Sequence, residues 1–86
     1  MAKVEIYTTL ACPYCVSAKD LLSRKGVDFA ELRVEGNPEL MAEAKQRSGG
    51  RMTVPQIFID DVHIGGFDEL SALERAGKLD AILGLK

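Results

Sequence analysis

Hydrophobic and polar residues follow one another along this chain in patterns that separate short strands from amphipathic helices. Alternating or continuous apolar runs between turn residues are typical of strands, whereas apolar positions three and four apart are typical of helices with one buried face. The pattern predicts four strands, at residues 4–8, 27–34, 56–59 and 62–64. It predicts helices over residues 13–25, from 38 to about 48, and from 69 to 76, with a last helical turn over 79–83.

Residues with special backbone roles mark the ends of these helices. Gly26 and Gly77 suit the position just past a helix, where the backbone commonly adopts a positive φ. Asn37 is expected to cap the second helix, because the proline that follows it fits the first helical position. Asp68 is expected to be the N-cap of the third helix.

The order of the elements predicts how the strands pair. Asp60-Asp61 is a tight turn between two apolar strands, which therefore form an antiparallel hairpin. Strands 4–8 and 27–34 are joined through a helix, and such a right-handed crossover makes them parallel. The sequence therefore predicts an α/β fold with a mixed four-stranded sheet and with helices on both faces.

Length and charge limit the classes of protein to which the chain can belong. Its 86 residues are expected to form a single domain, 1–86, with one modest core. The net charge of −2, with basic residues spread along the chain, gives no basic patch for nucleic acid. The sequence contains neither a signal-type apolar region nor a stretch of membrane-spanning length, so we expect a cytoplasmic protein without membrane attachment.

The motif Cys12-Pro13-Tyr14-Cys15 is the clearest candidate for chemistry, because it stands between the first strand and the first helix. A cysteine just outside a helix start faces unpaired N–H groups and the positive end of the helix dipole, which favour its thiolate. Thiols in this arrangement have pKa values of roughly 3.5–7, compared with about 8.5 for a free thiol. N–H groups of Tyr14 and Cys15 are expected to donate to the Cys12 sulfur. Cys15 lies one turn further along, close enough for a disulfide, so the motif predicts a redox-active pair.

The sequence gives less support to other roles of the cysteine pair. A structural disulfide would close a very short loop and restrict the unfolded chain little. A zinc site needs four ligands, whereas the sequence adds only His63, which fits better as a half-buried strand residue. Lys19, on the same helix, could stabilise the thiolate, but a solvated surface lysine is the preferred interpretation. No metal is therefore expected.

Two further segments are candidates for binding. Gly65-Gly66-Phe67-Asp68 offers backbone unobstructed by Cβ atoms beside a helix start, where N–H groups can hold a carboxylate and Asp68 can accept from an ammonium. A plain turn with a helix cap is the alternative reading of that segment. Thr53-Val54-Pro55 precedes the third strand, and on sequence alone its proline favours the trans isomer.

Taken together, these segments resemble the glutaredoxin family, in particular its short bacterial dithiol type. The likeness rests on Cys-Pro-Tyr-Cys at 12–15, Thr-Val-Pro at 53–55 followed by Gln-Ile-Phe, and Gly-Gly-Phe-Asp at 65–68, in that order and over essentially the whole chain. The resemblance implies a thioredoxin-like fold, with the strand order 4-3-1-2 and strand 3 antiparallel. It further implies a cis bond before Pro55 and glutathione-dependent reduction of disulfides. It also implies a monomer with no permanently bound cofactor, which uses glutathione as co-substrate and acts on disulfide-bonded or glutathionylated proteins.

The resemblance also assigns roles to individual residues. It makes Cys12 the nucleophile and Cys15 the resolving thiol. The implied glutathione-binding residues are Tyr14, Arg51, Thr53, Val54, Pro55, Gly66, Phe67 and Asp68. Among these, Val54 would pair through its backbone with the glutathione cysteine, and residues 66–68 would hold the γ-glutamyl head. Either Arg51 or Arg47 would receive the glycine carboxylate.

The chain departs from the family pattern at two places, and its sequence leaves two other functions open. Thr9 stands where many members have a lysine, and the loop 48–52 is one residue longer. One alternative is a redoxin reduced by thioredoxin reductase. The other is an iron–sulfur carrier that uses Cys12 and glutathione in a dimer.

Overall fold

The computed structural model describes residues 2–51 and 53–85, so Met52 in the predicted loop before Thr53, together with Met1 and Lys86, lies outside the described residues. Strands and helices follow one another in the predicted order. They are β1 (Val4–Thr8), α1 (Pro13–Arg24), β2 (Ala30–Arg33), α2 (Pro38–Arg47), β3 (Gln56–Ile59), β4 (Val62–Gly65), α3 (Phe67–Arg75) and α4 (Leu79–Ile82).

The four strands form one mixed sheet in the order β2-β1-β3-β4, which confirms the predicted topology. β1 pairs with β2 in parallel and with β3 antiparallel, and β3 pairs with β4 antiparallel. Asp60 and Asp61 turn the last hairpin with φ values of 51° and 66°. Positive φ at both central residues is the geometry of a tight two-residue hairpin, and aspartate tolerates it better than most residues.

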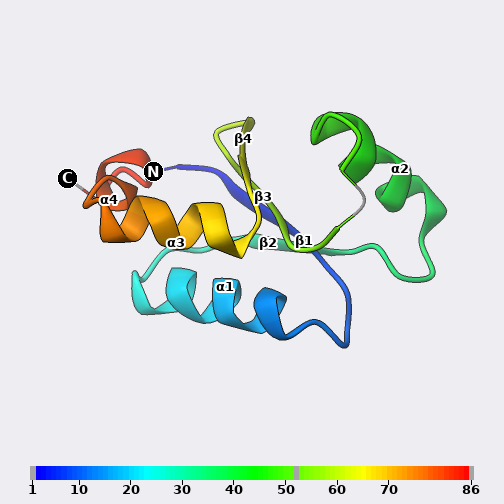
Figure 1. The fold of residues 1–86 in the computed structure, drawn as a ribbon, viewed down its shortest axis with the longest axis horizontal. Helices are drawn as coiled ribbons and strands as arrows, with labels where there is room; N and C mark the ends of the chain where they lie inside the picture. Colours follow the sequence, from blue (N-terminus) through cyan, green and yellow to red (C-terminus); the bar gives the residue numbers. More distant parts are fainter. Residues whose placement is uncertain (1, 52, 86) are drawn as a thin grey trace.

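Helices cover both faces of the sheet (Figure 1). α1 and α3 lie side by side on one face, whereas α2 lies on the other, near one end of the sheet. Alternation along the strands assigns side chains to the two faces. Ile6 and Ile57 pack in the larger core beneath α1 and α3, while their neighbours Tyr7 and Phe58 pack in the smaller core beside α2.

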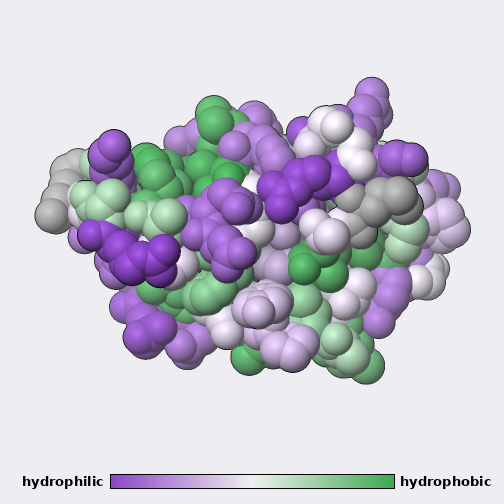
Figure 2. Space-filling view, viewed as in Figure 1, coloured by the Kyte–Doolittle hydropathy of each residue, from purple (hydrophilic) through white to green (hydrophobic). Residues whose placement is uncertain are grey.

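Charged side chains are spread over the surface. Figure 2 shows hydrophilic residues interspersed with small hydrophobic patches over the visible face, without one continuous apolar area. No helix within the described ranges 2–51 and 53–85 is long and apolar enough to cross a membrane.

Two predicted boundaries are wrong, each for a local reason. The second strand is confined to Ala30–Arg33 instead of 27–34. Gly26 has a φ of 74°, and the N–H of Val27 donates to the carbonyl of Leu22. Val27 therefore belongs to the turn that ends α1, and it is apolar because it enters the core.

The N-cap of α3 is Gly66 instead of Asp68, because the helix begins two residues earlier than expected. The other predicted caps are confirmed. The Asn37 side chain accepts a hydrogen bond from the Leu40 N–H at 3.1 Å, and Gly77 follows α3 with a φ of 71°.

Candidate active site

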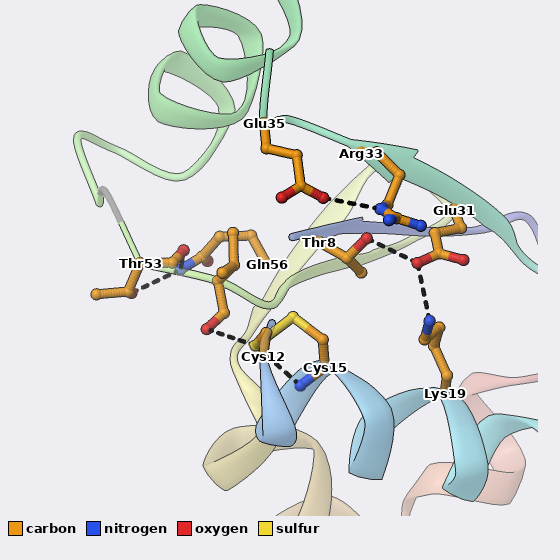
Figure 3. Close-up of a disulfide and its surroundings, with 10 residues drawn as sticks. Thr8, Cys12, Cys15, Lys19, Glu31, Arg33, Glu35, Thr53 and Gln56 are labelled. Carbon is orange, nitrogen blue, oxygen red and sulfur yellow. Dashed lines mark hydrogen bonds and ion pairs between the residues drawn. A yellow bond between two sulfur atoms is a disulfide. The ribbon is translucent and has the colours of Figure 1, made fainter. Parts of the chain in front are cut away.

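Cys12 and Cys15 lie at the start of α1 and form a disulfide, with their Cα atoms 5.2 Å apart (Figure 3). Cys12 is the N-cap residue, in extended conformation, and Pro13 occupies the first helical position. The N–H of Cys15 donates to the Cys12 sulfur at 3.1 Å, as expected. The expected bond from the Tyr14 N–H is not among the hydrogen bonds of the described residues. The pair is thus placed for reversible disulfide formation.

The two sulfur-bearing residues differ in access. Cys12 is 8% exposed, whereas Cys15 is 1% exposed and packs behind it. A reagent from solution therefore meets Cys12 first. Tyr14, between them in sequence, is 64% exposed, and its ring stacks on that of Phe67 with centroids 6.3 Å apart.

The segment before β3 lies against the cysteine pair. The carbonyl oxygen of Val54 is 3.7 Å from the Cys12 sulfur, a distance at which the reduced thiol can donate a hydrogen bond to it. The Val54–Pro55 bond is cis, as the resemblance implied. The buried side chain of Gln56 donates to the carbonyl of Thr53 at 2.9 Å and anchors this segment to the sheet.

The glycine segment before α3 forms the opposite wall. Gly65 has a φ of 119°, and a Cβ atom there would collide with the Glu69 side chain. Gly66 faces Pro55, because a Cβ at Gly66 would meet the Pro55 carbonyl oxygen at 3.4 Å. Space therefore requires glycine at position 65, whereas a Cβ at Gly66 would make ordinary contacts.

These segments enclose a groove beside Cys12, with a cavity volume of about 160 Å³. Its lining residues come from α1, the segment before β3, and the start of α3. They are Tyr14, Arg51, Thr53, Val54, Pro55, Gly66, Phe67, Asp68 and Glu69. The structure thus brings all eight residues predicted to bind glutathione into one groove.

A second hollow lies on the other side of Thr53 and Val54. It is mostly apolar, and α2 contributes Met41, Ala44 and Lys45 to its wall. Thr9, which stands at the usual lysine position, also lines this hollow and not the groove.

Glu69 is the one groove residue that sequence reasoning missed. Its carboxylate accepts a hydrogen bond from the Gly66 N–H at 2.6 Å, and this bond is the main reason that the pKa of Glu69 is lowered. The available signal was its spacing, since a glutamate three residues after an N-cap is typical of a capping box. A cap at Asp68 hides this spacing, because Glu69 then follows the cap directly.

The two arginines proposed for a carboxylate have different environments. Arg51 lines the groove, and its guanidinium lies 3.4 Å from the Glu69 carboxylate. Arg47 does not line the groove, so the prediction that places it there is wrong. Its guanidinium bonds to the Tyr7 hydroxyl at 2.7 Å and to Glu5 at 2.9 Å, on the α2 face of the sheet.

Lys19 is a partly exposed lysine held in an ion pair, and no hydrogen bond of the described residues joins it to the cysteine sulfur. Its ammonium lies 2.9 Å from the Glu31 carboxylate, which also accepts a hydrogen bond from Thr8 at 2.8 Å (Figure 3). Lys19, followed by Thr8, lowers the pKa of Glu31. This network links α1 to β1 and β2 behind the cysteine pair.

His63 is a half-buried strand residue, as expected. Its ring lies 2.7 Å from the Gln56 side-chain oxygen and packs against Phe58, with ring centroids 5.0 Å apart. Burial lowers its pKa. Within residues 2–51 and 53–85, no three His, Cys, Asp or Glu residues are grouped as they would be around a metal ion.

Comparison with known proteins agrees with this geometry. The sequence model of the glutaredoxin family matches residues 4–64. A glutaredoxin of Pseudomonas aeruginosa is 60% identical over 83 residues, covering 96% of this chain and 98% of that protein. Glutaredoxin 3 of Escherichia coli K12 is 59% identical over 83 residues, covering 96% of this chain and 99% of that protein.

Solved structures give the same result for the fold. The solution structure of glutaredoxin from Brucella melitensis matches with a TM-score of 0.85 and 55% identity, covering 99% of this chain and 91% of that one. A buckwheat glutaredoxin–glutathione complex matches with a TM-score of 0.87 and 28% identity, covering 96% and 77%. The fold is thus thioredoxin-like. The chain belongs to the glutaredoxin family of glutathione-dependent disulfide oxidoreductases, with Cys12 and Cys15 as its redox pair.

Proposed function

We propose that this protein reduces protein–glutathione mixed disulfides and protein disulfides through the motif Cys12-Pro13-Tyr14-Cys15, with glutathione as the electron donor. The observation that carries the proposal is the groove beside Cys12, whose walls offer backbone groups and charges suited to a γ-Glu-Cys-Gly tripeptide. The buckwheat relative that binds glutathione has the same fold. We further propose that the protein works as a cytoplasmic monomer.

In this proposal the tripeptide lies extended along the groove. Its cysteine pairs with the backbone of Val54, in the manner of an added strand, which brings the glutathione sulfur to Cys12. The Val54 carbonyl, 3.7 Å from the Cys12 sulfur, supports this placement. Tyr14 and Phe67 form an apolar edge, and Thr53 and Pro55 complete the same wall.

The γ-glutamyl head fits the start of α3. Asp68 is exposed and has no ion pair or hydrogen bond through its side chain among the described residues, so its carboxylate is available to an ammonium group. The first amides of a helix lack intrahelical partners and attract a carboxylate. Because the Gly66 N–H already donates to Glu69, we assign this role to the amides of Phe67 and Asp68. Arg51 is the cation that we assign to a glutathione carboxylate.

Deglutathionylation needs only Cys12, the more accessible of the two cysteines. The Cys12 thiolate attacks the glutathione sulfur of the mixed disulfide, and the protein thiolate leaves. A second glutathione thiolate then attacks the glutathione sulfur bound to Cys12, which gives oxidised glutathione and regenerates the Cys12 thiolate. The Cys15 N–H, 3.1 Å from the Cys12 sulfur, stabilises the thiolate as attacking and as leaving group.

Reduction of a protein disulfide uses both cysteines. The Cys12 thiolate attacks one substrate sulfur and forms an intermolecular disulfide, releasing the other sulfur as a thiolate. The Cys15 thiolate then attacks the Cys12 sulfur, and the substrate leaves fully reduced. Two glutathione molecules return the Cys12–Cys15 disulfide to the dithiol. Glutaredoxin potentials of about −200 to −230 mV allow glutathione to do so in the cytosol.

The test is glutathione-dependent turnover of two substrates, a glutathionylated peptide and a protein disulfide. Cys12→Ser is expected to abolish both activities, whereas Cys15→Ser keeps deglutathionylation and loses dithiol reduction. Turnover by Cys12→Ser would disprove the assignment of the nucleophile. Reduction by thioredoxin reductase but not by glutathione would favour a thioredoxin-type redoxin, and visible cluster absorbance after anaerobic purification would favour an iron–sulfur carrier.

A further inference from the structure

The glutathione groove contains an anion of its own. Glu69, in the first turn of α3, directs its carboxylate back over the glycine segment, where one oxygen accepts from the Gly66 N–H at 2.6 Å. The same oxygen lies 3.4 Å from Arg51 Nη1. The Glu69 carboxylate therefore already binds two of the groups that a glutathione carboxylate could use, the Gly66 N–H and the Arg51 guanidinium.

Arg51 is held at this end of the groove by that contact. Its guanidinium lies close to Gly66, since a Cβ at Gly66 would be 3.9 Å from Arg51 Nη2. Asp68 and Glu69 are both acidic and both line the groove, whereas Arg51 is the one basic residue among its lining residues in the described chain. The groove is thus short of positive charge for a ligand that has two carboxylates and one ammonium.

We infer that Glu69 is a specificity-determining residue that competes with the carboxylates of glutathione for Arg51, and so weakens the binding of glutathione to the groove. This inference rests on the proposed function. To bind a glutathione carboxylate, Arg51 must leave Glu69 or share its charge between two anions. Glu69 thereby favours release of oxidised glutathione at the end of each deglutathionylation turnover.

The geometry also limits the size of the effect. The Arg51 and Glu69 side chains are 44% and 46% exposed, so solvent screens their attraction. An exposed ion pair of this kind changes a binding constant by about two- to fivefold. A Glu69→Gln substitution removes the charge, while its amide oxygen can still accept from the Gly66 N–H.

The test is the inhibition constant of S-methylglutathione, which fills the groove without reacting. It is measured against reduction of a glutathionylated peptide whose own residues carry no charge. Glu69→Gln is expected to bind this inhibitor about two- to fivefold more tightly, with a lower KM and no increase in kcat. Loss of a merely structural contact would not tighten binding. Glu39→Gln is the matched control, because Glu39 is an exposed first-turn glutamate of α2 and lies outside the groove. It is expected to leave the inhibition constant unchanged.

An Arg51→Gln background separates competition from simple repulsion. If Glu69 competes for Arg51, the factor by which Glu69→Gln lowers the inhibition constant falls toward one in the Arg51→Gln background. An equal tightening in both backgrounds would mean that Glu69 only repels the ligand, and would overturn the inference. Weaker or unchanged binding in Glu69→Gln would overturn it as well.

A second variant keeps the negative charge but shortens its reach. Glu69→Asp is expected to tighten binding, because the shorter side chain releases Arg51, and unchanged binding would contradict competition. If the wild-type protein turns over the peptide but Glu69→Gln binds S-methylglutathione no more tightly, this inference alone is disproved. A wild-type protein without glutathione-dependent turnover would disprove the proposed function, and the inference with it.

Discussion

The guanidinium carbon of Arg47 lies 4.0 Å from the centroid of the Phe58 ring and covers the α2 face of the sheet. The same guanidinium bonds to Glu5 and to the buried Tyr7 hydroxyl, and these contacts raise the pKa of Arg47. Burial, followed by the bond to Glu43, raises the pKa of Tyr7. An arginine that looks in sequence like a surface charge of a helix end therefore packs over the aromatic rings of the smaller core.

Arg47→Met is accordingly expected to reduce stability without affecting the groove. The loss of the bonds to Glu5 and Tyr7 and of the cation–π contact should lower the free energy of unfolding by about 1–2 kcal/mol. Denaturant unfolding measures this loss, and the KM for a glutathionylated peptide should stay at the wild-type value. A raised KM with unchanged stability would contradict this prediction and indicate that Arg47 binds glutathione.

The Cys12 thiolate is expected to persist at neutral pH in the reduced protein. The Cys15 N–H faces the Cys12 sulfur at 3.1 Å, and α1 adds the positive end of its dipole. Titration of the thiolate absorbance in the ultraviolet, with Cys12→Ser as the control, should give a transition well below the value of about 8.5 for a free thiol. An ordinary thiol transition would contradict the proposed nucleophile.

The network behind the cysteine pair predicts a dependence of stability on pH. Lys19 and Thr8 lower the pKa of Glu31 below its usual 4.5, so the unfolded chain binds this proton first as the pH falls. The resulting stability is present above about pH 4.5 and is lost as the pH falls through the lowered pKa of Glu31.

Glu31→Gln tests this dependence. It should lower the free energy of unfolding at pH 7 by about 1 kcal/mol. The difference from wild type should narrow in acid, as measured by urea unfolding at several pH values. If the difference in the free energy of unfolding between wild type and Glu31→Gln stays constant as the pH falls below 4.5, the charge of Glu31 is not responsible for that difference.

The glycine at position 65 can be tested against another glycine with a positive φ. Gly65→Ala combines a φ of 119° with a collision with the Glu69 side chain, whereas Gly36→Ala has a φ of 69° and open space around the added Cβ. Gly36→Ala should cost about 1 kcal/mol of stability, and Gly65→Ala at least 1–2 kcal/mol more.

Gly65→Ala should also weaken the binding of S-methylglutathione, because relief of the strained φ of 119° shifts the adjoining backbone of residues 66–68, which we assign to the γ-glutamyl head, and this loss outweighs the release of Arg51 from Glu69. Thermal unfolding and inhibition constants measure the two effects. Equal behaviour of the two variants would argue against the close contact between Gly65 and Glu69.

The sequence alone determined the order of the elements, the antiparallel hairpin, the parallel crossover and the residues of the redox motif. Local chemistry sufficed for these, since Cys12-Pro13 fixes a helix start, Asp60-Asp61 a hairpin turn, and a helix between two strands a parallel crossover. The three motifs also indicated the groove before its shape was known, because each has its own turn or cap chemistry.

Only the tertiary structure decided which charges belong to the groove. Arg47 and Arg51 are four residues apart and look alike in sequence, yet one packs on Phe58 and the other reaches Glu69. Lys19 likewise found Glu31 on a neighbouring strand. Long charged side chains choose partners from whatever the packed elements bring within reach, and that choice depends on distances between segments that are remote in the sequence.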